Sequence, residues 1–262
     1  MHLYLCFMFF IFGLIFGSFY NVVGYRISKK ESLLFPSSHC TNCGHELKWY
    51  ELIPVLSYIM QLGKCRNCKD KISPFYMIFE LITGILFLLS YLVFGLTFKT
   101  AIAIIFSSII VIITVSDFLY FIIEDCVLIV GSILLIIVLF ISNGFQTNNF
   151  DIVLALKETG IDILFALIPF IIMLLIKLLG DFIFKKESMG GGDIKLMFIF
   201  GLVLGPLNAI STIFIASFIA LPISIIILKL KNSHEIPFGP FLSLGALILL
   251  FSGFNIIDLF VI

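Results

Sequence analysis

The chain has 262 residues, of which 61% are hydrophobic and 12% charged, and its formal net charge is zero. A soluble domain carries roughly 25% charged residues and about 45–50% apolar ones, so this chain could not cover a water-exposed surface with polar groups. The balanced charge gives no reason to expect a nucleic-acid partner. The composition excludes an ordinary soluble domain and predicts an all-α polytopic membrane protein.

Long apolar segments recur along the chain. A hydrocarbon core of about 30 Å takes about 20 helical residues to cross. The run from Ile194 to Leu230 is too long for one crossing, and Gly205-Pro206 supplies a break because proline cannot continue the helical hydrogen bonding. We predict a bundle of about eight spans, although the short 194–205 segment could be a half-helix and seven spans are the alternative. The predicted spans are residues 3–24, 75–96, 100–116, 126–142, 161–180, 194–205, 207–229 and 238–260.

The flanking charges predict how these spans are oriented. The first segment has no basic start and no small-residue cleavage site before Arg26, so we expect a retained span rather than a signal peptide. Lysine and arginine gather on the cytoplasmic side of membranes. With eight spans, only Lys99 and Lys157 face the other side, which places the amino terminus outside and the polar segment after the first span in the cytoplasm. The basic residues on the cytoplasmic side are Arg26, Lys29, Lys30, Lys48, Lys64, Arg66, Lys69, Lys71, Lys185, Lys186, Lys229 and Lys231.

Four of the six cysteines form two Cys-x-x-Cys pairs in that polar segment, Cys40 with Cys43 and Cys65 with Cys68. Four thiolates at this spacing can enclose one tetrahedral Zn²⁺, two from each turn. Such a closed shell leaves no position for a substrate, so we predict a structural zinc. Reducible disulfides or unligated thiols are the alternative, and a reducing cytoplasm argues against them.

Carboxylates stand beside three apolar spans, where charged groups are costly and often functional. Asp117 ends the third predicted span, Glu124 and Asp125 precede the fourth, and Asp193 follows a run of three glycines. Two carboxylates that share one proton can hydrolyse a peptide bond without a metal. Taken singly, each aspartate is better explained as a helix cap or a boundary residue in water. Taken together with the stretch Gly190-Gly191-Gly192-Asp193-Ile194-Lys195, the aspartates favour the catalytic interpretation.

Several motifs are spread over most of the chain. One is Gly190 to Asp193, followed by Ile194-Lys195-Leu196. The others are Gly17-Ser18-Phe19-Tyr20-Asn21-Val22-Val23 with Tyr25-Arg26, Trp49 to Tyr58, Gly63-Lys64-Cys65-Arg66 with Cys68, Ile72-Ser73 with Tyr76 and Glu80, and Ile236 to Phe241. In kind and in order, these motifs resemble those of the bacterial type IV prepilin peptidases, which belong to the Gly-x-Gly-Asp membrane aspartic peptidases.

The resemblance implies an activity and assigns residues to it. The family's first catalytic aspartate opens an Asp-(seven residues)-Asp stretch, a spacing that Asp117 and Asp125 share. It therefore implies Asp117 and Asp193 as the catalytic pair. The residues that support this pair by the same resemblance are Asp125, Gly190, Gly192 and Lys195.

The expected reaction is removal of the leader peptide from prepilin or pseudopilin substrates of type IV pili, type II secretion or competence systems, at the cytoplasmic face of the bacterial plasma membrane. The resemblance also implies methylation of the new amino terminus with S-adenosylmethionine, for which Gly63 is the suspected residue. The alternatives are a related Gly-x-Gly-Asp peptidase without methyltransferase activity, an ion-coupled transporter, or a non-catalytic zinc-ribbon scaffold. We expect three parts: a first span (1–27), a cytoplasmic four-cysteine zinc domain (28–73) and a membrane peptidase domain (74–262).

Overall fold

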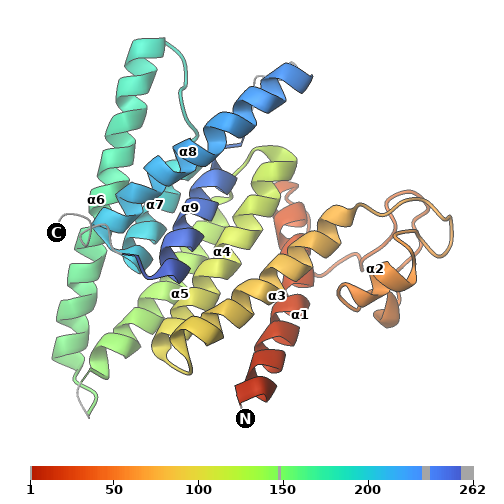
Figure 1. Cartoon of the computed structure of the whole chain (residues 1–262), viewed down its shortest axis with the longest axis horizontal. Coiled ribbons are helices and arrows are strands. Elements are labelled where there is room, and N and C mark those ends of the chain that lie inside the picture. Colours follow the sequence, from red (N-terminus) through yellow and green to blue (C-terminus); the bar gives the residue numbers. More distant parts are fainter. Residues whose placement is uncertain (1, 147–148, 232–236, 255–262) are drawn as a thin grey trace. The chain divides into compact units, whose positions relative to one another are not determined.

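The computed structural model describes residues 2–146, 149–231 and 237–254, and its regular structure is almost entirely helical (Figure 1). Within these ranges the only strand-like pairing is two isolated antiparallel bridges, one in each cysteine turn. The predicted all-α class is confirmed. The helices are α1 (His2–Ser28), the 3₁₀ turn η1 (Trp49–Glu51), α2 (Leu56–Met60), α3 (Pro74–Phe94), α4 (Phe98–Tyr120), α5 (Asp125–Gly144), α6 (Ile152–Phe184), α7 (Gly191–Leu204), α8 (Pro206–Lys231) and α9 (Gly239–Ser252).

Six helices, α1, α3, α4, α5, α6 and α8, are long and apolar enough to cross a membrane. Two more apolar helices, α7 and α9, have 14 residues each and lie where the spans 194–205 and 238–260 are predicted. Residues 255–260 of the last predicted span lie outside the described residues. The multi-span architecture is thus confirmed, with six helices of full membrane length and two shorter ones in the part of the chain that the structure describes.

The helix ends follow the local sequence. α7 ends at Leu204, Gly205 has a φ of 78°, and α8 begins at Pro206, so the predicted break is present. α6 begins nine residues before the predicted 161, because the Asp151 carboxylate accepts hydrogen bonds from the backbone N–H groups of Val153 and Leu154 and caps the helix there.

Contacts divide the chain into two compact units, Met1–Gly95 and Leu96–Ile262. In the first unit α1 packs along α3. A Cβ on Gly13 would lie 2.7 Å from the Gly84 Cα, and one on Gly17 would lie 2.9 Å from the Glu80 Cα. Side chains could not fit at these distances, so the small residues of α1 let the two backbones approach closely. By its contacts α3 belongs to this first unit, while the functional ranges 28–73 and 74–262 stay a prediction.

The polar segment between α1 and α3 is built from two similar turns. In the first, the Gly44 N–H donates to the Cys40 carbonyl at 2.9 Å; in the second, the Lys69 N–H donates to the Cys65 carbonyl at 3.0 Å. Gly44 and Lys69 both adopt left-handed backbone conformations, with φ of 70° and 61°. Each Cys-x-x-Cys pair therefore lies in a tight turn, and the four sulfurs of the two turns face one another.

Glu80 of α3 joins this polar segment to the membrane helices of the first unit. Its buried carboxylate accepts a hydrogen bond from the Val55 backbone N–H at 2.7 Å and another from the Ser18 hydroxyl of α1. Buried carboxylates are costly unless they are hydrogen-bonded in this way. Val55 has a φ of 62°, an uncommon value for a β-branched residue, so the contact holds a strained turn in place.

The second unit is organised around α7. This helix packs against α4, α5, α6, α8 and α9, and it contributes the fully buried Leu196, Met197, Ile199 and Phe200. Phe200 meets Phe106 of α4 edge-on, with ring centroids 5.6 Å apart. Because the rest of α7 is buried on all sides, the residues of its first turn are held in a defined position.

Candidate active site and metal centre

Asp117 lies in the last turn of α4 and is 6% exposed. The sequence predicts the end of the helix at this residue, but the helix continues to Tyr120. It stops where Phe121 adopts the left-handed conformation and donates its N–H to the Asp117 carbonyl at 3.0 Å. Gly239, the first residue of α9, donates its backbone N–H to the Asp117 carboxylate. A Cβ on Gly239 would lie 2.6 Å from the Asp117 Oδ2, so a side chain there would have to displace this carboxylate.

Asp193 lies in the first turn of α7 and is 7% exposed. Its Oδ1 is buried and has no hydrogen-bond partner among the described residues. The charge on Asp117 acts directly on the Asp193 carboxylate. Two aspartates more than seventy residues apart in the sequence are thus brought together in a poorly solvated place.

The glycine run before Asp193 is required at one position, by packing and not by backbone conformation. None of Gly190, Gly191 and Gly192 has a positive φ, so their backbone conformation does not require glycine. Gly192 is required by packing instead, because a Cβ there would lie 2.5 Å from the Cβ of Ile123. Gly191 has nothing within 4 Å of an added Cβ, and Gly190 meets only the Asp193 Oδ2, at an ordinary 3.8 Å. Gly192 lets the start of α7 lie against the loop between α4 and α5.

Asp125 has a different environment from Asp117. It begins α5, its side chain is 59% exposed, and its Oδ1 is 2.6 Å from the Nζ of Lys195. The ion pair links the first turn of α5 to the first turn of α7, two residues beyond Asp193. Asp125 is therefore paired with a cation at the surface, while Asp117 is buried beside Asp193.

Sequence reasoning missed two of these contacts. Gly239 belongs to the Phe238–Phe241 stretch, which counted only as a mark of resemblance; Ile236, the first residue of that motif, lies outside the described residues. Ile123 lies in the loop between α4 and α5, and nothing in the sequence indicated its contact with Gly192. A glycine in an otherwise bulky apolar stretch indicates close approach of a backbone, but the sequence does not say what it approaches.

The polar segment brings Cys40, Cys43, Cys65 and Cys68 together, with all four sulfurs within 4.8 Å of one another. Cys40 Sγ lies 3.8 Å from Cys68 Sγ, and Cys43 Sγ lies 3.9 Å from Cys65 Sγ. A Zn–S bond of about 2.3 Å in a tetrahedral shell gives sulfur separations of about 3.8 Å. A disulfide needs about 2.05 Å. The four cysteines therefore fit a zinc ion and are not disulfide-bonded.

The pKa values of two of these thiols show how strongly the four sulfurs and the nearby backbone N–H groups act on one another. The His45 backbone N–H lowers the pKa of the Cys43 thiol to about 7, which favours the thiolate that binds metals. At Cys68 the Asp70 N–H acts to lower the pKa, but burial and the neighbouring sulfurs outweigh it and raise the pKa to about 12. Four thiolates so close together repel one another unless a metal ion lies between them.

Gly63 lies at the end of α2, next to the second cysteine turn. It is buried, its φ is 65°, and a Cβ would lie 2.8 Å from the Tyr58 Oη. Its N–H donates to the Tyr58 carbonyl at 2.9 Å, and its own carbonyl accepts from the Ile72 N–H at 2.8 Å. The position needs glycine for both conformation and space.

Two compact helical units, a four-cysteine cluster and two buried aspartates next to apolar helices are features expected of a membrane aspartic peptidase. Similarity to known protein families agrees with this class. Residues 11–94 match the bacterial peptidase A24 N-terminal domain, and residues 104–225 match the type IV leader peptidase family. The chain belongs to the type IV leader peptidase family and is a multi-pass membrane aspartic peptidase.

Individual relatives match over most of their length. The chain is 30% identical to the prepilin leader peptidase/N-methyltransferase of Bacillus subtilis, covering 96% of each protein. It is 30% identical to the type 4 prepilin-like proteins leader peptide-processing enzyme of Escherichia coli, over 90% of this chain and 89% of the relative. The prepilin leader peptidase/N-methyltransferase of Pseudomonas aeruginosa is 28% identical over 92% of this chain and 88% of its own length. No solved structure matches.

Proposed function

We propose that the protein cleaves the leader peptide from prepilin-like substrates with Asp117 and Asp193 as its catalytic pair. The observation that carries the proposal is the burial of these two carboxylates beside each other at the ends of α4 and α7. Family membership and the names of its relatives give the substrate class. The pairing of Asp125 with Lys195 supports the choice of Asp117 over Asp125.

The geometry supports general acid–base hydrolysis. Two carboxylates at close range hold one proton between them, because like charges in a poorly solvated site do not both stay ionised. The ionised carboxylate takes a proton from a water molecule, whose oxygen forms a bond to the scissile carbonyl carbon. The protonated carboxyl donates a hydrogen bond to the carbonyl oxygen. Collapse of the tetrahedral intermediate breaks the C–N bond, and the leaving nitrogen takes up a proton from the pair.

Neighbouring residues hold this pair in place. The Gly239 N–H fixes the Asp117 carboxylate, and the close packing of Gly192 on Ile123 fixes the backbone next to Asp193. Lys195 and Asp125 tie the first turns of α7 and α5 together. These residues are positioning residues in the proposal, because none of them needs to touch the scissile bond.

The proposed orientation follows from charge. The segment between α1 and α3 carries seven of the chain's sixteen lysines and arginines, as the cytoplasmic side of membranes does. This puts the amino terminus outside and the cysteine cluster inside. The substrate's leader would then be cut at the cytoplasmic face while its apolar helix stays in the bilayer.

The cysteine cluster would hold a structural Zn²⁺ in a closed four-sulfur shell. We also propose that the protein methylates the new amino terminus, as the names of its relatives state for them. S-adenosylmethionine would supply the methyl group: its C–S bond breaks as the amine nitrogen forms a C–N bond and loses a proton, and S-adenosylhomocysteine is released. The zinc would hold the polar segment in the shape that this reaction needs.

The proposal is tested by incubating the purified protein with a prepilin and S-adenosylmethionine and measuring the product by mass spectrometry. Asp117→Asn and Asp193→Asn should each reduce cleavage on the order of 10⁴-fold, as the loss of one member of a catalytic unit does. Asp125→Asn removes only the exposed ion pair with Lys195 and should reduce cleavage by less than tenfold, as expected of a positioning residue that does not carry out the chemistry. Full cleavage by either Asp117→Asn or Asp193→Asn would refute the pair. A product without the added 14 Da would refute methylation alone, since one methyl group replaces one hydrogen.

A further inference from the structure

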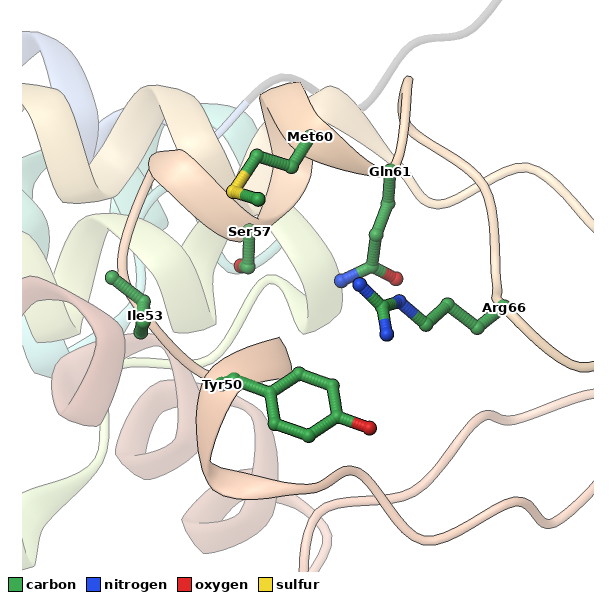
Figure 2. A pocket seen from close by; sticks show the side chains of 6 residues that line it. All are labelled: Tyr50, Ile53, Ser57, Met60, Gln61 and Arg66. Atoms are coloured by element: carbon green, nitrogen blue, oxygen red, sulfur yellow. The ribbon is translucent and has the colours of Figure 1, made fainter.

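The polar segment contains a hollow of about 320 Å³ that the cleavage site does not use. It is formed between η1, α2 and the second cysteine turn (Figure 2). Its volume lies at the lower end of the range of about 300–1,000 Å³ for small-molecule sites. The residues around it are Tyr50, Ile53, Ser57, Met60, Gln61 and Arg66.

One side of the hollow is a cation held by a buried acid. Arg66 lies between Cys65 and Cys68, and its Nε is 3.9 Å from the Oε1 of Glu51. The Glu51 side chain is 1% exposed, and its Oε2 accepts a hydrogen bond from the Lys48 N–H and contacts the His45 ring nitrogen at 3.3 Å. Within the described ranges the Arg66 guanidinium donates no hydrogen bond, although it carries five N–H donors. It is suited to bind a carboxylate through two parallel hydrogen bonds.

The facing side offers an acceptor without a donor. The Oε1 of Gln61 is buried and has no hydrogen-bond partner among the described residues. In Figure 2 the ends of Gln61 and Arg66 point toward each other above the ring of Tyr50. An α-amino acid carries both groups that these side chains call for. Its ammonium can donate to the Gln61 amide oxygen, and its carboxylate can accept from the Arg66 guanidinium.

The remaining walls suit a larger apolar group. The guanidinium of Arg66 lies over the Tyr50 ring, 4.9 Å from its centroid. Ile53 and Met60 add apolar surface, and Ser57 adds one hydroxyl. Aromatic rings bind flat heterocycles by stacking and bind cations through their faces.

We propose that this hollow binds the methyl donor S-adenosylmethionine, with Arg66 and Gln61 taking its amino-acid end and Tyr50, Ile53 and Met60 lining the place of its adenine. The proposal rests on the proposed methyltransferase activity. It fits the chemistry of the donor, which combines an α-amino acid, a positive sulfonium and a purine in one molecule.

The same geometry explains how Gly63 and the zinc would affect methylation. The hydrogen bonds of Gly63 join Tyr58 of α2 to Ile72, which follows the turn that holds Arg66, and Gln61 comes directly after α2. A side chain at Gly63 would collide with Tyr58 and move one wall against the other. Loss of the zinc would release the Cys65–Cys68 turn that aims Arg66. Both changes would open the hollow without touching Asp117 or Asp193.

The test measures binding of radiolabelled S-adenosylmethionine to the purified full-length protein by equilibrium dialysis. Arg66→Ala and Gln61→Ala should weaken binding at least tenfold, and Arg66→Lys should weaken it too, because an ammonium cannot form the paired contact. Lys64→Ala removes a charge of the same sign two residues away in the sequence, at an exposed position that does not line the hollow, and should bind like the wild type. Zinc content near one per chain in each variant shows that the segment is folded.

Ultraviolet crosslinking of the labelled donor, followed by peptide mapping, gives a second measurement that needs no variant. Label in the segment 49–66 supports the proposal, and label confined elsewhere overturns it. Wild-type affinity in both Arg66→Ala and Gln61→Ala also overturns it, while leaving the methyltransferase function intact. If the wild-type protein binds no donor and leaves the processed substrate unmethylated, the methyltransferase function fails together with the inference.

Discussion

Two adjacent glycines allow a sharp test of how the start of α7 is positioned. An alanine at Gly192 would place its Cβ 2.5 Å from the Cβ of Ile123, whereas an alanine at Gly191 would meet nothing within 4 Å. Ordinary contact between such atoms begins at 3.4 Å, so Gly192→Ala has to displace the helix start or the Ile123 loop by about 0.9 Å. The displaced atoms belong to the residue next to Asp193.

A misplacement of about 1 Å at a catalytic group can cost about 10²-fold in rate, or about 2.7 kcal/mol of transition-state stabilisation. We expect Gly192→Ala to lower kcat/KM for prepilin cleavage by that factor. Gly191→Ala is the matched control, because it makes the same chemical change one residue away in the same helical turn. It should cleave like the wild type, and its helix should be more stable by up to about 1 kcal/mol because alanine favours helix over glycine.

The assay is cleavage of a purified prepilin in detergent, with thermal unfolding of each variant measured in the same buffer. The packing argument requires a loss of rate at a temperature where Gly192→Ala is still folded. Equal cleavage rates for the two alanine variants would show that the contact with Ile123 does not position Asp193.

Four other outcomes follow from the same contacts. Gly239→Ala should reduce cleavage on the order of 10²-fold, because its Cβ would lie 2.6 Å from the Asp117 Oδ2, and Gly160→Ala, which has open space, should not. The purified protein should contain one zinc per chain. Cys40→Ser and Cys65→Ser should lower this zinc content, whereas Cys6→Ser and Cys126→Ser should leave it unchanged; equal zinc content in all four variants would exclude the four-cysteine cluster as the zinc site. Gly13→Ala should destabilise the first unit by about 1–3 kcal/mol in thermal unfolding, since its Cβ would lie 2.7 Å from α3 backbone, and Phe12→Ala, at an exposed position, serves for comparison. The Lys48 backbone N–H holds the pKa of Glu51 below its ordinary value, so this carboxylate stabilises the fold at neutral pH and loses that contribution as the pH falls toward its lowered pKa. Glu51→Gln should therefore flatten the acid side of the curve of unfolding free energy against pH, and an unchanged curve would contradict this.

The sequence was sufficient for the helical framework because apolar length and proline position act locally. A stretch of about 20 apolar residues has few alternatives to a membrane helix. Proline at 206 ends hydrogen bonding wherever it stands, so the break between α7 and α8 could be read directly. The helix ends were less accurate: Asp117 lies inside α4 because the left-handed residue Phe121, four residues later, is what ends the helix.

The sequence by itself determined the all-α membrane class, the position of the spans and the two cysteine pairs, since spacing and composition carry that information. Only the tertiary structure decided which of Asp117 and Asp125 lies beside Asp193. The two residues are eight positions apart at the same helix boundary, so the choice depends on where α4 ends and on the cation that Lys195 brings to Asp125. The packing of Gly192 and Gly239, and the meeting of Arg66 with Gln61 and Tyr50, likewise depend on contacts between distant segments, which no local pattern encodes.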